Sequence, residues 1–240
     1  MEKKEWKIIK VFTEHAFDFF SMFLAISLGF IVDSYKDSQN SKAIALEMSS
    51  DLISEICEDT ASIKKLIMDT ESKIKHLDKL FPLIDSFTSS PQIDEQIYKF
   101  AAHINNKLWF ERHTITYNLL INTGYMQYFT KRASASLTRY DIACDRTIDI
   151  LVQEKSMLNS KIFPFLQQIF HTENFHTILQ GGHMSALPEL HNWTKENRWL
   201  MHNYVFELRD INVHILGHLY DVQKASRNTL KVLNEEYTQK

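Results

Sequence analysis

The sequence predicts an all-α protein: an N-terminal transmembrane helix that continues into a long stalk helix, followed by a helical bundle. Three observations predict this fold class. The chain has 5 glycines and 4 prolines in 240 residues, whereas sheets and turns use more of both. No segment carries a clear strand pattern. Neither glycine nor proline interrupts residues 30–81. We expect a membrane-anchoring helix at 1–35, a stalk helix at 36–82 and a bundle domain at 90–240.

The first element is an uncharged apolar run at residues 19–32. A membrane span needs about 20 apolar residues, with about 17 as the lower limit, and the run reaches 17 only when it is extended back to Ala16 across Asp18. No small-residue cleavage site follows, so a retained anchor is favoured over a signal peptide. The alternative is a buried hairpin helix of a soluble bundle.

One face of this first helix carries its small and acidic residues. Glu14, Asp18, Ser21, Ala25 and Gly29 follow one another at steps of four, three, four and four, which keeps them on one side of a helix. Small residues at four-residue spacing let helices approach closely in lipid, and charged residues there face a bundle interior. We therefore expect a homo-oligomer with this face inward and the phenylalanines toward lipid.

The second element is a long helix from about Ser41 to Phe81, ended by Pro82. Its apolar residues approximate a heptad pattern with a break near Asp59. The predicted core positions are Ala45, Ser49, Leu52, Ile56, Ile63, Ile67, Thr70, Ile74, Leu77 and Phe81.

Caps and breakers predict the remaining elements. Ser90 is expected as an N-cap before Pro91, Gly124 as a helix end, and Pro164 as a kink or restart. These signals predict helices at 91–110, 112–122, 133–163 and 194–237, with an irregular stretch at 171–192.

Composition and the absence of common motifs exclude several functional classes. A net charge of −3 provides no general attraction for nucleic acid. The phosphate-binding, dinucleotide-binding, C-x-x-C and H-E-x-x-H patterns are all absent, so we expect no cofactor, no metal and no small-molecule substrate. The two cysteines, Cys57 and Cys144, could form one bridge, but two buried thiols are the favoured interpretation.

Two blocks resemble a group of uncharacterised bacterial single-span membrane proteins with an N-terminal anchor and a helical domain. They are residues 14–56 and residues 116–141, and the second carries the group's pattern at Tyr117, Leu120, Gly124 and Tyr140. This resemblance implies the architecture and no activity.

The stretch "RDINVH", from Arg209 to His214, resembles the R-x4–6-H signature of HEPN ribonucleases. Together with an N-terminal membrane helix it is similar to the HEPN-like membrane accessory proteins of type VI-B CRISPR systems. That resemblance implies a membrane pore that assists an RNA-guided RNase in antiviral defence. It also implies a dimer in which Arg209 and His214 from two protomers face one another, with His214 handling a 2′-hydroxyl proton and Arg209 binding the scissile phosphate. The alternative is a structural pair, in which Arg209 meets an acid and His214 packs inside the bundle.

Two further patterns are weaker. Asp210, His214 and His218 share a helix stripe that could bind a divalent metal, with help from His171, His176, His183 or His191. Trp193, Trp199, Tyr204 and Phe206 could stack on RNA bases, although aromatic residues at helical spacing are more often core.

The leading prediction is an oligomeric, pore-like membrane effector, more a binding protein than an enzyme. The alternatives are a metal-independent RNase that uses Arg209 and His214 and a passive membrane-tethered scaffold. Expected partners are membrane lipid, further copies of the chain, and an RNA-guided RNase or RNA. Lysines before the anchor favour a cytoplasmic N-terminus, but the absent disulfide framework and the defence role favour a bulk on the cytoplasmic side of the bacterial inner membrane.

Overall fold

The computed structural model describes residues 2–86, 90–105, 108–171, 173, 177 and 190–238, with the side chains of 2–16, 18, 91 and 105 outside that description. Every regular element in these ranges is a helix. The predicted all-α fold class is confirmed.

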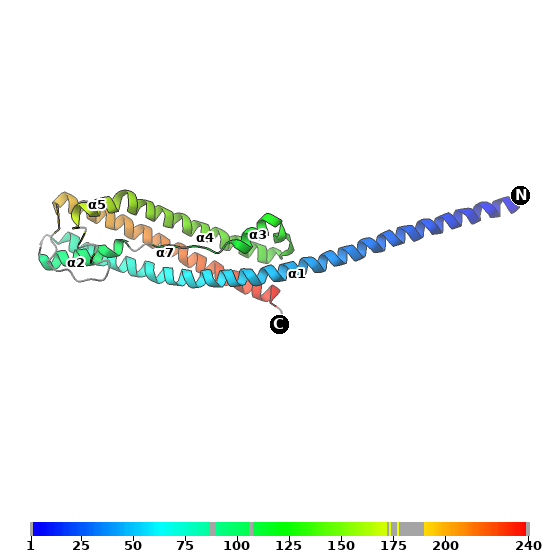
Figure 1. Cartoon of the computed structure of the whole chain (residues 1–240), viewed down its shortest axis with the longest axis horizontal. Coiled ribbons are helices and arrows are strands. Elements are labelled where there is room, and N and C mark those ends of the chain that lie inside the picture. The colour runs from blue at the N-terminus through cyan, green and yellow to red at the C-terminus, as the bar shows by residue number, and fades with distance from the viewer. Residues whose placement is uncertain are drawn as a thin grey trace.

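Helix α1, Glu2–Asp85, runs without a break from the N-terminus to the far end of the molecule (Figure 1). Its first half projects from the bundle, and Ala45 is its first fully packed residue, at 2% exposure. A polar segment at residues 33–44, called the neck here, joins the apolar run to the bundle. At about 1.5 Å per residue the neck is about 18 Å long.

The bundle consists of residues 45–85 of α1 with two other long helices, α4 (Lys131–Met157) and α7 (Lys195–Tyr237). Helix α7 packs against both α1 and α4. Helices α1 and α4 run in the same direction, and α7 runs antiparallel to both (Figure 1). Residues 45–82, predicted as part of a separate stalk, therefore belong to the bundle and contribute to its core.

Buried residues recur at alternating steps of four and three in all three long helices, the spacing of a left-handed coiled coil. There is no break at Asp59, which is itself a core residue. The core passes through Lys73 and Leu80 instead of the predicted Ile74 and Phe81, and the predicted Ile67 is buried beside Leu66. The core positions of α1 are Ala45, Ser49, Leu52, Ile56, Asp59, Ile63, Leu66, Thr70, Lys73, Leu77, Leu80 and Ile84.

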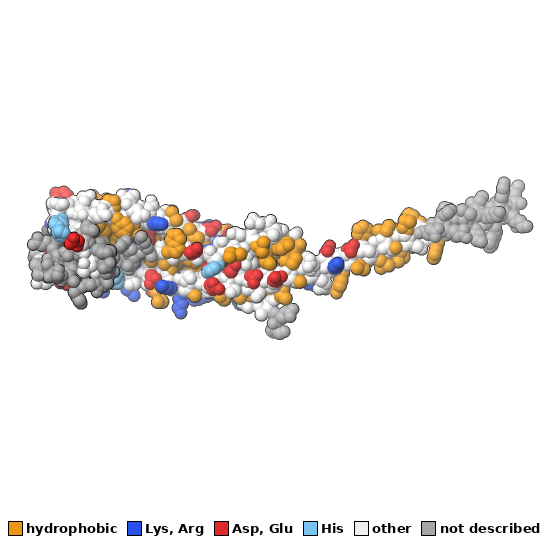
Figure 2. Space-filling view, viewed as in Figure 1, with side chains coloured by type: hydrophobic (Ala, Val, Ile, Leu, Met, Phe, Trp, Pro, Cys, Tyr) orange, Lys and Arg blue, Asp and Glu red, His pale blue; other side chains and the backbone are white. Residues whose placement is uncertain are grey.

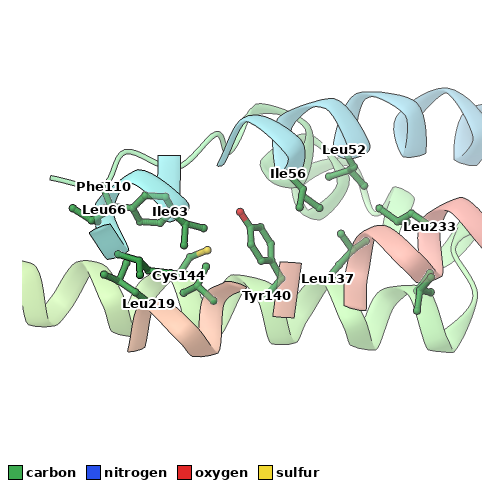
Figure 3. Close-up of a cluster of buried hydrophobic side chains, with 14 of the residues drawn as sticks. Leu52, Ile56, Ile63, Leu66, Phe110, Leu137, Tyr140, Cys144, Leu219 and Leu233 are labelled. Atoms are coloured by element: carbon green, nitrogen blue, oxygen red, sulfur yellow. The ribbon is translucent and has the colours of Figure 1, made fainter. Parts of the chain in front are cut away.

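The coiled coil has two apolar clusters. The proximal core, nearer the neck, uses α1 up to Ile67, and the distal core uses α1 from Leu77 onward. Figure 3 shows part of the proximal core, where side chains from α1, α4 and α7 meet. The labelled members include Leu52, Ile56, Leu137, Tyr140, Leu219 and Leu233.

Helix α2, Pro91–Ala102, begins as predicted, because the Ser90 hydroxyl accepts a hydrogen bond from the Ile93 N–H. It ends eight residues before the predicted Phe110. A short 3₁₀ turn, η1 (His103–Asn105), follows, and residues 108–114 have no regular structure. We call residues 108–114 the strap. Its residues alternate between inside and outside: Leu108 and Phe110 are buried and Trp109 is exposed, so the period is that of an extended chain.

The remaining connections follow the predicted breakers. Helix α3, Ile115–Thr123, is closed by Gly124 at a left-handed φ of 74°, and the 3₁₀ turn η2, Tyr125–Tyr128, leads into α4. Helix α4 passes through a π-helical turn, η3 (Leu158–Ile162), into α5 (Phe163–Ile169). Pro164 lacks an N–H and its ring crowds the carbonyl four residues earlier, which accounts for the widened turn before it. Helix α7 begins after its N-cap, Thr194.

Candidate membrane segment and polar clusters

The projecting part of α1 is apolar and uncovered. Phe17 and Phe30 are 74% and 71% exposed, and the described side chains between 17 and 40 are exposed except for half-buried Ser27. Orange apolar side chains wrap this part of the helix (Figure 2). Among the described residues, one helix is long and apolar enough to cross a membrane, and it is this one. The alternative of a core helix requires a covering segment, and no described residue packs here.

The small face of α1 is open along its described length. Ser21, Ala25 and Gly29 are all exposed, and a Cβ built on Gly29 would meet nothing within 4 Å. This face is therefore free to contact another helix closely. The side chains of Glu14 and Asp18, predicted to extend the same face, lie outside the described residues.

Arg209 and His214 lie on α7 but do not converge within one chain. The Arg209 Nε donates to Asp78 Oδ1 of α1 at 2.6 Å, whereas His214 is 65% exposed and its Nε2 is 3.7 Å from Asp210. Five residues along a helix turn about 140° around its axis, so the two side chains leave α7 in different directions. Arg209 thus meets a neighbouring acid, as the structural alternative expects, but His214 is not packed inside the bundle.

The Arg209 contact belongs to a ladder along the seam between α1 and α7. The acids of α1 in this ladder, Glu71, Asp78 and Asp85, are seven residues apart. Asp85 lies 3.8 Å from the His202 ring, and Glu71 accepts a hydrogen bond from the Tyr220 hydroxyl at 2.8 Å. Seven-residue spacing of polar pairs at the rim of a coiled coil fixes the orientation of its helices.

The residues predicted as possible metal ligands do not come together among the described residues. In the part of the chain that the structure describes, no three His, Cys, Asp or Glu side chains are placed to hold a metal. The rings of His171 and His191 lie 4.0 Å apart, and the predicted contributors His176 and His183 are outside the described residues.

The aromatic set on α7 and just before it is divided between core and surface. Tyr204 packs edge-on against Phe165 at 5.3 Å, and Trp193 packs on the distal core. Trp199 and Phe206 are 68% and 56% exposed. The set therefore forms no continuous stacking surface.

A buried polar layer separates the two apolar cores. Lys73 of α1 and Glu154 of α4 are 0% and 2% exposed, and the Lys73 ammonium is 2.7 Å from Glu154 Oε1. The Asn212 amide of α7 donates to the same oxygen at 2.9 Å. Burial lowers the pKa of Lys73, and Glu154 opposes that shift by favouring the charged form. All three helices thus contribute one side chain, which fixes their relative register.

A second polar cluster lies in the proximal core around Asp59, which is fully buried. Asp59 accepts hydrogen bonds from the Tyr140 hydroxyl at 2.6 Å, from the His113 ring at 2.7 Å and from the His113 backbone N–H at 3.1 Å. Nearby, Glu55 accepts from the Thr116 N–H at 3.1 Å, at the start of α3. The cluster therefore ties the strap and α3 to α1.

Arg112 fixes the other side of the strap. Its side chain is 5% exposed and pairs with Asp141 of α4. The guanidinium also lies over the Tyr117 and Tyr140 rings, 5.2 and 5.8 Å from their centres. A planar cation between two aromatic faces is a favourable buried arrangement.

The two cysteines are free thiols. Cys144 is buried, as predicted, and burial raises its pKa to about 12, which makes it a poor nucleophile. Cys57 is exposed, so the prediction of two buried thiols is wrong for this residue.

Sequence reasoning missed both buried polar clusters. The available signal was the heptad frame: Asp59, Lys73 and Asn212 stand at core positions, where charged or amide side chains need partners.

The comparisons add no relatives. Searches of protein families, curated proteins and solved structures find nothing that matches this chain.

Proposed function

We propose that this chain is an oligomeric membrane effector whose N-terminal helices assemble in the bilayer into a pore-like ring. The observation that carries the proposal is the uncovered apolar segment of α1. Eleven large apolar side chains between Phe17 and Val32 are at least half exposed. Burying one such side chain contributes about 1.5–3 kcal/mol, so transfer of the set from water to lipid favours membrane insertion by more than about 10 kcal/mol.

The small face supports assembly of several copies. In lipid, helices associate through close packing more than through the hydrophobic effect, and small residues permit the closest approach. Ser21, Ala25 and Gly29 provide such a face, and nothing in the described part of the chain occupies it. Asp18 and Glu14 continue it in the sequence, and carboxylates at membrane depth require a shared polar interior. A ring of helices provides that interior.

The neck separates the apolar run, which we place in the membrane, from the bundle. It places the first packed residue, Ala45, about 18 Å from the apolar run, so the bundle stands clear of the lipid and presents its surface to a partner. The cytoplasmic face of the bacterial inner membrane, an RNA-guided RNase or RNA as partner, and a role in antiviral defence follow from the resemblance of the anchor and the Arg209–His214 stretch.

The test compares two double variants of the full-length protein. Ala25→Leu with Gly29→Leu fills the small face, and the matched control, Phe23→Leu with Phe30→Leu, places the same residue on the phenylalanine face. We measure oligomer mass by light scattering in detergent and dye release from liposomes.

We expect the small-face variant to lose oligomer mass and dye release, while the control retains both. Equal behaviour of the two variants would contradict assembly through this face. An intact oligomer that releases no dye would support the passive scaffold. RNA cleavage by the purified protein that is lost in both Arg209→Ala and His214→Ala would support the RNase.

A further inference from the structure

A groove on the side of the bundle lies between the strap and helix α4. Its volume is about 470 Å³, and small-molecule sites in proteins typically measure about 300–1,000 Å³. Residues 108–110 of the strap form one wall, and residues 148–159 of α4 form the other. Helix α4 contributes side chains at steps of three and four residues, so a single face of this helix lines about 17 Å of the groove.

The extended conformation of the strap builds both the floor and the rim of this groove. Leu108 and Phe110 are buried, and Phe110 lies beside Leu66 of α1 in the proximal core (Figure 3). Because side chains alternate along an extended chain, Trp109 between them points outward and is 67% exposed. The two buried neighbours thus hold the indole at the mouth of the groove, where it leaves a large apolar surface in water.

The α4 wall is apolar at one end and polar at the other. The apolar end, nearer the neck, is lined by Ile148, Leu151 and Val152, and the polar end is lined by Lys155, Ser156 and Asn159. Val152 is 58% exposed, so the apolar end has uncovered surface of its own. At the polar end an ammonium, a hydroxyl and an amide provide hydrogen-bond donors within about one turn of helix. Such a gradient fits a ligand with an apolar body and one polar head.

The polar end of the groove carries a positive charge. The Lys155 ammonium lies 5.5 Å from the centre of the Trp109 ring, a favourable position for a cation. Its neighbours one turn away on α4, Leu151 and Asn159, are not acids, and no carboxylate among the described residues pairs with it. At the apolar end, Asp149 is exposed and disfavours an anion there. The two ends together direct an anionic head toward Lys155.

The surroundings favour a small ligand over a protein surface. A specific protein interface buries about 800 Å² on each partner, and its centre is depleted of charged residues. Beside the groove, α4 exposes Asp145, Asp149 and Gln153, so the uncovered apolar surface of this helix face ends there. An apolar patch of this extent, with one cation at its end, matches one small amphiphilic anion.

We propose that the groove between the strap and α4 binds a small amphiphilic carboxylate. The apolar chain lies against Val152 and covers the Trp109 indole, and the Lys155 ammonium donates to the carboxylate. The Ser156 hydroxyl and the Asn159 amide are the further donors at that end. Because the ligand contacts both walls, its binding also holds the strap on α4. This inference does not depend on the membrane function.

Titration of the full-length protein in lipid nanodiscs with octanoate tests the site. Octylammonium, which has the same chain and a cationic head, is the matched probe, and free concentrations are corrected for uptake by the lipid. The protein carries 5-fluorotryptophan, so that ¹⁹F NMR reports its 4 tryptophans, and Trp109→Phe assigns the Trp109 signal. We expect octanoate to shift this signal saturably and octylammonium to bind about tenfold more weakly, because attraction becomes repulsion. The signal of Trp193, which packs on the distal core, should not respond.

Substitutions of exposed side chains separate the charge from the apolar wall. Lys155→Met keeps an apolar stem and should weaken octanoate about three- to fivefold, whereas Lys155→Glu should reverse the preference in favour of octylammonium. Val152→Asp places a carboxylate in the apolar wall and should abolish octanoate binding. Lys161→Met, at a lysine that is 57% exposed and outside the groove, is the matched control and should change neither affinity.

Three results would overturn the proposal: no saturable shift of the Trp109 signal, equal binding of octanoate and octylammonium, or an unchanged preference in Lys155→Glu. A change of oligomer mass in Val152→Asp, measured by light scattering, would also contradict it, because the groove would then be a contact between copies of the chain.

Discussion

Replacing Lys73 with methionine removes the cation of the polar layer between the two cores and keeps a side chain of similar length. Glu154, 2% exposed, then keeps the Asn212 amide as its partner among the described residues. Removing one member of a buried ion pair typically lowers the free energy of unfolding by about 3–5 kcal/mol. We expect that loss for Lys73→Met at neutral pH.

The double variant Lys73→Met, Glu154→Leu removes both charges. A buried ion pair replaced by apolar residues of similar volume is often neutral or stabilising. The Asn212 amide loses one acceptor but keeps the Leu208 carbonyl at 2.7 Å, which limits the remaining loss to about 1 kcal/mol. The double variant should therefore be more stable than either single variant.

Denaturant unfolding of the full-length protein in mild detergent, followed by tryptophan fluorescence, measures these differences. The matched control is Lys99→Met, which makes the same substitution in an exposed i,i+4 pair with Glu95 and should change stability by no more than about 0.5 kcal/mol. If Lys73→Met behaves like Lys99→Met, or if the double variant is as unstable as the single ones, the layer does not act as a buried ion pair.

Three further substitutions test separate parts of the fold by the same unfolding measurement. Tyr140→Phe removes the 2.6 Å hydrogen bond to the buried Asp59 and should lower stability by about 1.5–3 kcal/mol; no change would mean that the bond is not formed. Gly124→Ala places a side chain at a φ of 74° and should lower stability by about 1–2 kcal/mol, and a stabilising effect would contradict the left-handed conformation. A double-mutant cycle of Arg209→Ala and Asp78→Ala should give a coupling of about 1 kcal/mol or less, because both side chains are partly exposed. A much larger coupling would indicate a buried role for Arg209.

The sequence predicted those parts of the fold that depend on local chemistry. Ser90, Gly124 and Thr194 mark helix ends through their own caps or φ angles, so their positions need no knowledge of the rest of the molecule. The predicted end of α2, Phe110, lies eight residues beyond the observed end. Leu108 and Phe110 instead pack in an extended strap against helices that are distant in the sequence. Tertiary contacts here outweigh local helix preference.

The two buried polar clusters were less predictable than the helix ends, because they too depend on tertiary contacts. Lys73 and Glu154 are 81 residues apart in sequence, as are Asp59 and Tyr140, and these pairs exist only because α1 and α4 run parallel in one register. The apolar pattern alone favoured Ile74 over Lys73 as a core residue, because a charge at a core position is normally unfavourable. The partner that makes it favourable cannot be identified from either helix alone.

Alkaline carbonate extraction of membranes from cells that express the full-length protein tests the central claim most directly. The claim is that residues 19–32 lie in the bilayer while the bundle stands outside it. Carbonate strips proteins that are held only by charge or by other proteins, so we predict that the chain stays in the membrane pellet and dissolves only with detergent. Recovery of the chain in the carbonate supernatant, as a monodisperse monomer without detergent, would contradict membrane insertion and the proposed ring with it.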